Sequence, residues 1–442
     1  MSTCSAAPAK MVPMWHQQVF ALDAKYNAPR MSNQSALGML YIRRRSQLLR
    51  DKDSRNSEIR SRYLKLRSEL LRLRYGSVAD QTSLGSRLSV NGLGAEVAAR
   101  QENSQSRTTA ESFAFAGVHH VFEHHRAPIS ALKFANNDKS KLCCASLDGM
   151  ISICDTTSDP PSVVALLEGH KKGVTAIDWS MSNDLVVSSS LDATLRLWKV
   201  QTDAPPVCLR VVGNRLRCEV LCCAFVPANN NLVVTGNSKG FLHLLNVSTG
   251  MYTPGGSCTM GGKILALTCE ESGGSMMWAG NDRGNIVSFR LDPGSGSLVK
   301  LSRMNGPGGP VTSLSWRSWL SKEAPWPTLL VNSACNAVSL YRVANRLGGL
   351  SLWRQYPIKH RQYPVRSTFC PQMGACLIAT GSEDGAIHLL DSAREGKAAR
   401  VNRLHGHSAP TLALAFNYDE SYLATADHQG LVIIWRNQQR NS

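Results

Sequence analysis

Short segments of alternating apolar and polar residues, separated by Gly, Asn, Asp and Ser, fill the chain from about residue 112 onward. Residues 168–199 show the unit most clearly: a Gly-His pair, an apolar strand, a Ser-rich strand, an Asp in a tight turn, and a third strand ending in Trp198. Residues 405–436 repeat this order and end in Trp435. Alternation with a period of two between turn residues predicts four-stranded β units rather than helical repeats.

Two series of positions define the register of the repeat. The end of the third strand recurs at intervals of 44 to 52 residues, at Cys154, Trp198, Leu245, Phe289, Tyr341, Leu390 and Trp435. A bulky aromatic residue late in the first strand recurs at Phe134, Trp179, Phe225, Trp316, Phe369 and Phe416. We therefore predict seven units that form the blades of an all-β propeller, because a single unit cannot bury both of its faces alone.

The two ends of the repeat region are expected to meet. Only seven residues follow Trp435, which is too few for the outer strand of the last blade. Residues 113–122, FAFAGVHHVF, precede the first unit and have the composition of a strand. We predict that this segment supplies the missing strand and closes a propeller that spans residues 112–442.

These repeats resemble those of the WD-repeat β-propeller family. The resemblance implies a hydrogen-bonded set of His, Ser or Thr, Asp and Trp in each regular blade, because a buried His or Asp is costly unless it is paired. The second unit carries the set as His170, Ser188, Asp192 and Trp198. The seventh has His407, Thr425 and Trp435, with Gln429 at the Asp position, and the first has His125, Asp148 and Cys154. Units three to five lack most of it, so we expect them to form the irregular side of the ring.

The first quarter of the chain differs in charge and pattern. Residues 1–111 hold 18 Lys and Arg against 9 Asp and Glu, within a chain that has 49 against 32 and a formal net charge of +17. Apolar residues at Ile59, Tyr63, Leu66, Leu70 and Leu73 predict an amphipathic helix that ends at Gly76. Residues 1–76 are thus predicted to be a basic helical extension. Its helix either docks on the propeller or pairs with a partner or a second copy.

Residues 43–45 and the segment after residue 76 suggest further roles. Arg43, Arg44 and Arg45 are consecutive and fit a nuclear-import signal or a patch for acidic partners, with a solvated helix face as the alternative. Residues 77–111 are rich in Ser and Thr and predict a flexible linker. The basic charge outside the extension is interpreted as spread over all seven blades.

Composition and motifs argue against an enzyme, a cofactor or a metal site. The 13 cysteines form no Cys-x-x-Cys pair, and with no secretory signal they are interpreted as reduced core residues of a soluble, intracellular protein. Gly236-Asn-Ser238-Lys-Gly240 matches the Gly-x-Ser-x-Gly nucleophile pattern, but no helix is expected after it. The close histidines are assigned to the closing strand and the Gly-His position instead of a metal: His119, His120, His124 and His125.

An insertion in the fifth unit is the main candidate surface for partners. It carries Trp319 and Trp326 beside Arg317 and Lys322. Large aromatic residues near arginine are typical of interface anchors. The alternative is that the tryptophans pack beneath their own loop.

The resemblance to the family extends over the chain, through segments such as WHQQVFALDAKYNA, YIRRRSQLLR, FAFAGVHHVF and SLDATLRLW. It implies a non-enzymatic scaffold, mainly nuclear with some in the cytoplasm, that binds other proteins in transcriptional or chromatin regulation and has no membrane partner. The alternative is direct binding of DNA or RNA through the basic N-terminal arm.

Overall fold

The computed structural model describes residues 115–200, 205–270, 275–292, 294–306, 308–317, 326–345, 347–370 and 377–437. All of them belong to the unit Arg107–Ser442. The predicted extension with Arg43, Arg44 and Arg45, and the predicted linker, lie outside the described residues. The proposals about them therefore stay predictions.

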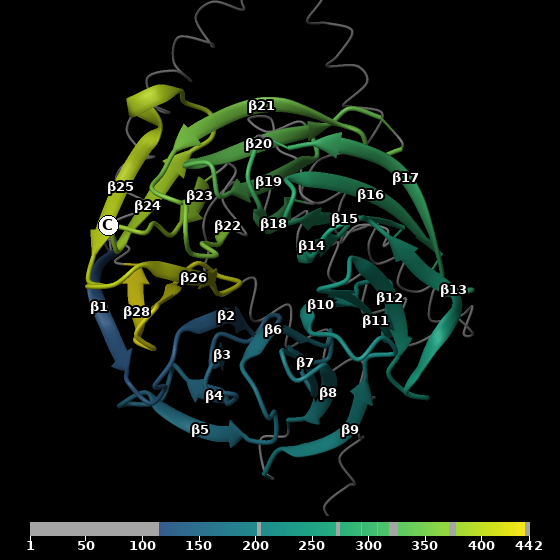
Figure 1. Ribbon diagram of the computed structural model, residues 1–442. Coiled ribbons are helices and arrows are strands. Elements are labelled where there is room, and N and C mark those ends of the chain that lie inside the picture. Colours follow the sequence, from purple (N-terminus) through teal and green to yellow (C-terminus); the bar gives the residue numbers. More distant parts are fainter. Residues whose placement is uncertain are drawn as a thin grey trace, which may run out of the picture. The chain divides into compact units, whose positions relative to one another are not determined.

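The described residues form 28 β-strands and one short 3-10 helix, η1 (Gly396–Ala399). The strands make seven four-stranded antiparallel sheets, which Figure 1 shows as blades around a ring. The prediction of a seven-bladed all-β propeller is confirmed. Within the described part of the chain, no helix is both long enough and apolar enough to cross a membrane.

The first four blades follow one another along the chain, each from its inner to its outer strand. Blade one contains β2 (Ile129–Phe134), β3 (Lys141–Ser146), β4 (Ile151–Asp155) and β5 (Ser162–Leu167). Blade two contains β6 (Val174–Trp179), β7 (Leu185–Ser190), β8 (Thr194–Lys199) and β9 (Val207–Gly213). Blade three contains β10 (Val220–Val226), β11 (Asn229–Asn237), β12 (Phe241–Asn246) and β13 (Met251–Thr259). Blade four contains β14 (Ile264–Cys269), β15 (Met276–Asn281), β16 (Asn285–Asp292) and β17 (Ser297–Asn305).

The remaining three blades complete the ring. Blade five contains β18 (Val311–Arg317), β19 (Thr328–Ser333), β20 (Ala337–Val343) and β21 (Leu350–Pro357). Blade six contains β22 (Ser367–Phe369), β23 (Leu377–Thr380), β24 (Ala386–Asp391) and β25 (Arg400–His405). Blade seven contains β26 (Thr411–Phe416), β27 (Tyr422–Asp427), β28 (Val432–Asn437) and β1 (Phe115–Phe122).

The seventh blade takes its outer strand from the other end of the repeat region. Strand β1 pairs antiparallel with β28, so that Val118 lies opposite Trp435 and Phe122 opposite Val432. Figure 1 shows the blue β1 beside the yellow β28. This is the position that the sequence analysis assigned to residues 113–122, of which the structure describes the strand from Phe115.

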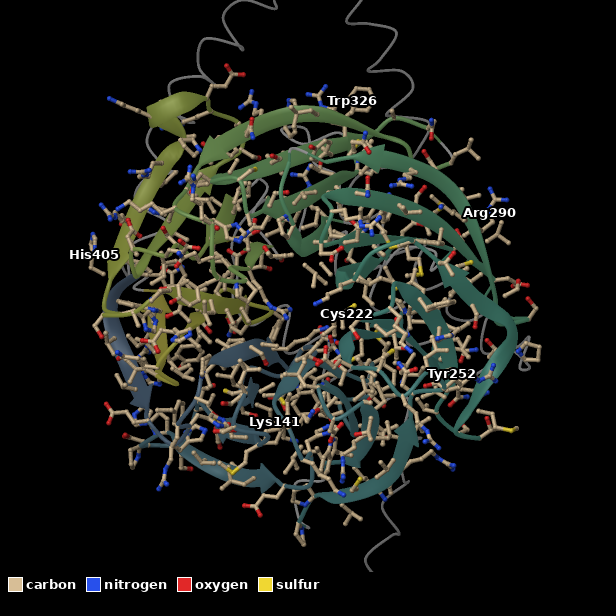
Figure 2. All side chains as sticks on the ribbon, in the orientation of Figure 1. Lys141, Cys222, Tyr252, Arg290, Trp326 and His405 are labelled. Carbon is tan, nitrogen blue, oxygen red and sulfur yellow. The ribbon has the colours of Figure 1, made fainter. Side chains whose placement is uncertain are left out.

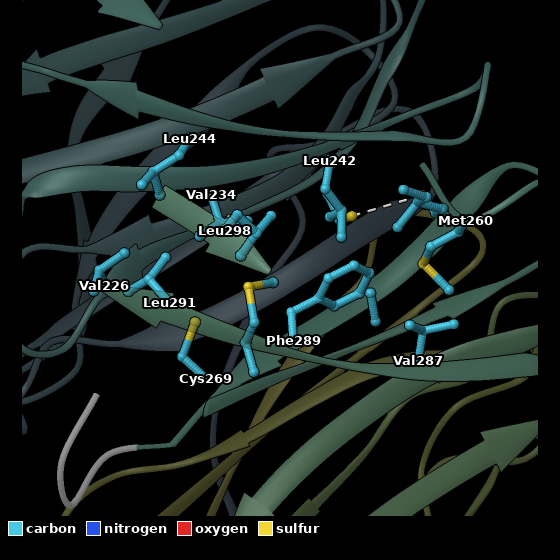
Figure 3. Close-up of a cluster of buried hydrophobic side chains, with 14 of the residues drawn as sticks. Val226, Val234, Leu242, Leu244, Met260, Cys269, Val287, Phe289, Leu291 and Leu298 are labelled. Carbon is cyan, nitrogen blue, oxygen red and sulfur yellow. Dashed lines mark hydrogen bonds between the residues drawn. The ribbon is translucent and has the colours of Figure 1, made fainter. Parts of the chain in front are cut away.

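The apolar core is divided among the junctions between blades. Seven clusters of buried side chains are present in the described region, and each is built mainly from two neighbouring blades. Figure 3 shows the cluster between blades three and four, where Val234 and Leu244 of one blade meet Val287 and Phe289 of the next. Because each blade face is buried only by its neighbour, the ring must close to be stable.

The two series of sequence markers lie in one row across each blade, separated by a residue of the middle strand. In blade two, Trp179 of β6 is opposite Val186 of β7, which is opposite Trp198 of β8. Blade four uses the same positions but has Cys269 in place of the aromatic residue, opposite Met277. Strand length is irregular beyond the predicted units three to five, because blade six contains the shortest strands, β22 with three residues and β23 with four.

Candidate protein-interaction surface

Blade two holds a buried hydrogen-bonded set. His170 Nδ1 lies 2.9 Å from Asp192 Oδ2, and His170 Nε2 lies 2.8 Å from Ser188 Oγ. Trp198 Nε1 donates to the same Ser188 oxygen at 2.8 Å. Burial opposes ionisation of Asp192, but hydrogen bonds from Thr194 and His170 outweigh it and lower its pKa to about 2.

This Ser-His-Asp arrangement resembles a catalytic triad but is sealed. The Ser188 side chain belongs to a residue with 0% exposure, and its oxygen already accepts the indole N–H of Trp198. Burial also lowers the pKa of His170, although Asp192 opposes that shift. A nucleophile needs access to its substrate, so the set serves to tie strands together.

Blade seven carries a similar set with one change from the sequence prediction. His407 Nδ1 lies 2.9 Å from Asp427 Oδ2, while Thr425 Oγ1 lies 2.8 Å from His407 Nε2 and accepts from Trp435 Nε1 at 2.8 Å. The assignment of the Asp position to Gln429 is therefore wrong as a description of the network. Asp427, at the end of β27, supplies the carboxylate from two residues earlier and also accepts the backbone N–H of Gln429.

Blade one compensates in another way. His125 Nδ1 lies 2.9 Å from Asp148 Oδ2, and its Nε2 lies 3.0 Å from Ser152 Oγ. Ser152 comes from β4, whereas Ser188 of blade two comes from the second strand of its blade. The sequence analysis missed Ser152, because a Cys occupies both the hydroxyl and the Trp positions in this unit.

The neighbouring histidines have separate contacts. His124 Nε2 lies 2.7 Å from Ser152 Oγ, and burial, reinforced by His125, lowers the pKa of His124 to about 4. His119 Nε2 lies 3.1 Å from the Thr156 carbonyl oxygen, and the His120 ring packs edge-on against Phe122. No group of three metal-ligating side chains was found among the described residues.

The Gly-x-Ser-x-Gly motif lies in a tight turn between two strands. Strand β11 ends at Asn237 and β12 begins at Phe241, so Ser238 and Gly240 connect adjacent antiparallel strands of blade three. A nucleophile elbow needs a strand that leads into a helix. The motif does not have that context here.

The insertion in blade five is described at its two ends, while Trp319 and Lys322 lie outside the described residues. Arg317 is only 1% exposed, and one of its terminal nitrogens donates to the Trp326 carbonyl oxygen at 3.1 Å and to Thr328 Oγ1 at 3.0 Å. The prediction that Arg317 contacts a partner is therefore wrong, because this guanidinium is engaged inside the blade. Trp326 is 51% exposed, and Figure 2 places it at the outer rim of the ring.

Trp326 begins a row of aromatic and guanidinium groups. The Arg342 guanidinium carbon lies 5.7 Å from the Trp326 ring centre and 4.4 Å from that of Trp353, and the Arg354 guanidinium lies 5.1 Å from Trp353. Arg354 also donates to the carbonyl oxygens of Ser392 at 2.7 Å and Arg394 at 2.8 Å. These contacts join blade five to the segment 392–400 of blade six.

We call this surface the blade five–six seam; it comprises Trp326, Arg342, Trp353, Arg354 and residues 392–400. Sequence analysis identified Trp326 and missed the other members. Arg342 lies on β20 and Trp353 on β21, and these strands pair with a register shift between Leu340 and Tyr341, so sequence spacing alone does not indicate that the two side chains meet. A Trp-Arg pair at 353–354, in a unit with an aromatic insertion, was the available sequence signal.

Comparison with known proteins supports the repeat assignment. The family model "WD domain, G-beta repeat" matches residues 117–155, 161–199 and 399–436, which contain the histidine sets of blades one, two and seven. The WD repeat-containing protein WDS homolog of Arabidopsis thaliana is 27% identical over 326 residues, covering 64% of this chain and 59% of that protein. The WD repeat-containing protein SL1-17 of Schistosoma mansoni is 27% identical over 181 residues, covering 41% and 56%. The chain thus spans less than two thirds of these relatives.

A shorter match and a solved structure add to this. Human pre-mRNA-processing factor 19 is 36% identical over 84 residues, 19% of this chain and 16% of that protein. The crystal structure of the Cps50 (Swd1) β-propeller domain of Myceliophteria thermophila superposes with a TM-score of 0.57 at 16% identity, covering 73% of this chain and 99% of that one. Three blades of this chain therefore match WD40 repeats, and the chain has a seven-bladed β-propeller fold.

Proposed function

We propose that this protein is a non-enzymatic interaction scaffold that recruits other proteins through the rim of its propeller. The observation that carries the proposal is the half-exposed Trp326 beside Arg342 at the outer rim of blade five. Exposed Trp and Arg on a rigid support are typical of the residues that dominate binding energy at protein interfaces. The sealed Ser188 in blade two, together with the WD40 repeats, favours binding over catalysis.

We further propose a mainly nuclear location with some protein in the cytoplasm, and a role in transcriptional or chromatin regulation. The name of pre-mRNA-processing factor 19 assigns that relative to RNA processing, which is consistent with a nuclear role for this chain. The triple arginine at residues 43–45 is the segment that we assign to nuclear import.

The test is affinity purification of the full-length chain from cell extract, with and without nuclease, followed by identification of the retained proteins. Wild type is compared with Trp326→Ala and with Leu166→Ala, which shortens an exposed apolar side chain on blade one. We expect a set of proteins that survives nuclease and is lost only with Trp326→Ala, at an unchanged melting temperature. Capture that disappears with nuclease would instead favour the alternative, direct nucleic-acid binding through the N-terminal arm.

A further inference from the structure

The positive charge of the propeller is concentrated in two neighbouring blades. Residues 307–405, which form blades five and six, contain 12 Lys and Arg against 5 Asp and Glu. The rest of residues 112–442 contains 19 against 18. The expectation that this charge is spread over all seven blades is therefore wrong.

The seam lies at the junction of these two basic blades. Arg342 is partly buried between Trp326 and Trp353. Within the described residues its guanidinium has no hydrogen bond or ion pair, and its Nε atom is shielded from solvent without an acceptor. Stacking on the indole rings orders this guanidinium while leaving its N–H edge without an anion.

The blade-six side of the seam adds more cationic groups. Arg394, Lys397 and Arg400 are exposed along segment 392–400. Burial lowers the pKa of His388 to about 4, and Arg400 is the largest charged contributor to that shift, which is consistent with a positive local potential. Lys397 and Arg400, unlike their neighbour Arg394, have no carboxylate partner within the described part of the chain.

Arginines in and beside the seam already pair with carboxylates of the chain itself. Arg394 Nε lies 3.1 Å from Asp391, a terminal nitrogen of Arg403 lies 3.0 Å from Asp384, and Arg354 lies 3.5 Å from Glu395. Arginine is well suited to carboxylates, because its planar N–H groups can bind two oxygens at once.

From these contacts we propose that the blade five–six seam binds an acidic protein segment. Carboxylates of the segment form ion pairs with Arg342, Lys397 and Arg400. A large apolar side chain of the same segment covers the exposed face of Trp326. The proposal rests on the scaffold function above and adds the chemical class of the partner.

The composition of the seam favours a protein over a nucleic-acid strand. A single strand is held by several aromatic platforms on which successive bases stack. Here the Trp353 ring is already in contact with two guanidinium groups, which leaves Trp326 as the open aromatic surface of the seam. The cations of the seam are mostly arginines, and Arg with Trp is enriched at protein interfaces whereas Lys is depleted.

The experiment measures binding of full-length protein to a fluorescein-labelled 20-residue peptide, made of four Asp-Glu-Phe-Asp-Leu repeats, by fluorescence anisotropy. The seam variant is Arg342→Gln/Lys397→Gln/Arg400→Gln. Its matched control, Arg43→Gln/Arg44→Gln/Arg45→Gln, also removes three positive charges, but from the N-terminal arm. We expect the seam variant to weaken binding by about tenfold or more, the control to change it by less than about threefold, and Trp326→Ala to weaken it separately.

Three probes and one further variant make the outcome decisive. The same peptide with Asn and Gln in place of its acids should not bind, and a 20-nucleotide oligouridine RNA should bind wild type more weakly than the acidic peptide does. Equal losses in both triple variants, or seam-dependent RNA binding tighter than peptide binding, overturn the proposal. Should the triple variant melt early, Arg400→Gln alone, at an exposed position of β25, must still weaken peptide binding.

Failure of this proposal is separable from failure of the scaffold function. If the peptide does not bind but nuclease-resistant partners still depend on Trp326, the scaffold stands and the acidic class is refuted. If neither the peptide nor any protein depends on Trp326, the rim of blade five is refuted as the interaction surface.

Discussion

Replacing Asp427 by alanine tests the physical account of blade seven. The carboxylate is fully buried together with His407, and its Oδ2 lies 2.9 Å from His407 Nδ1. Its Oδ1 accepts the backbone N–H groups of Gln429 at 2.9 Å and Leu431 at 3.1 Å. Alanine therefore leaves one imidazole N–H and two backbone N–H groups without their acceptor.

The magnitude follows from these contacts. Removing one member of a buried, hydrogen-bonded pair costs about 3–5 kcal/mol of unfolding free energy. Asp427→Asn keeps one acceptor oxygen and should cost about 1–3 kcal/mol. Gln429 is exposed, so Gln429→Ala should change the free energy by less than about 0.5 kcal/mol. The sequence pattern alone placed Gln429 at the Asp position and assigned no role to Asp427.

The assay is urea denaturation of the three full-length variants, with tryptophan fluorescence as the signal that monitors unfolding. Hydrogen bonds from His407 and the turn outweigh burial and lower the pKa of Asp427 in the folded protein. Its stabilisation is therefore complete above the ordinary carboxyl pKa of about 4 and is lost as pH falls through the lowered native value. Equal destabilisation by Gln429→Ala and Asp427→Ala, or an unchanged midpoint for Asp427→Ala, would refute the assignment.

Two further predictions concern ring closure and acid sensitivity. Phe115→Ala and Phe122→Ala should each lower the free energy of unfolding by about 3–5 kcal/mol, because the two side chains pack into different inter-blade clusters. Val118→Ala, at an exposed position of the same strand, should lower it by less than about 0.5 kcal/mol. Similar melting temperatures for all three variants would contradict closure by β1. Burial, with Arg400 assisting, lowers the pKa of His388 to about 4, so its contribution to stability is complete above about pH 6.5 and is lost as pH falls toward 4. His388→Phe should flatten urea midpoints across that range, and an unchanged pH slope would exclude His388 as the cause.

The repeat could be read from the sequence because its markers are local and recur at nearly constant spacing. Trp179 and Trp198 mark the first and third strands of one blade, and both lie opposite Val186 of the middle strand. The closing strand was predictable for a similar reason, since the last blade lacked a strand and the segment before the first blade had the right composition.

Asp427 and Ser152, which complete the sets of blades seven and one, were not predictable from the motif. A hydrogen bond requires only that a suitable atom lies within reach, and that atom can come from a residue at another position of the repeat. His407 needs an acceptor near its Nδ1, and Asp427 supplies it from two residues earlier than Asp192 does in blade two. In blade one, Ser152 supplies the hydroxyl from the third strand. A fixed offset from the terminal Trp cannot find either residue.

The seam also shows why the net charge of the sequence did not reveal this surface: two arginines that count equally in the charge make different contacts in the fold. Arg354 and Tyr356 of β21 both donate to the Arg394 carbonyl oxygen, at 2.8 and 3.1 Å, so these side chains hold blades five and six together. Arg342 makes no such bond within the described region, yet Trp353 and Trp326 keep it ordered. Arg354 thus forms hydrogen bonds across the junction between blades, whereas Arg342 is held between two indole rings without a hydrogen bond in the described region. Loss of stability should therefore follow from Arg354→Ala, and loss of binding from Arg342→Gln.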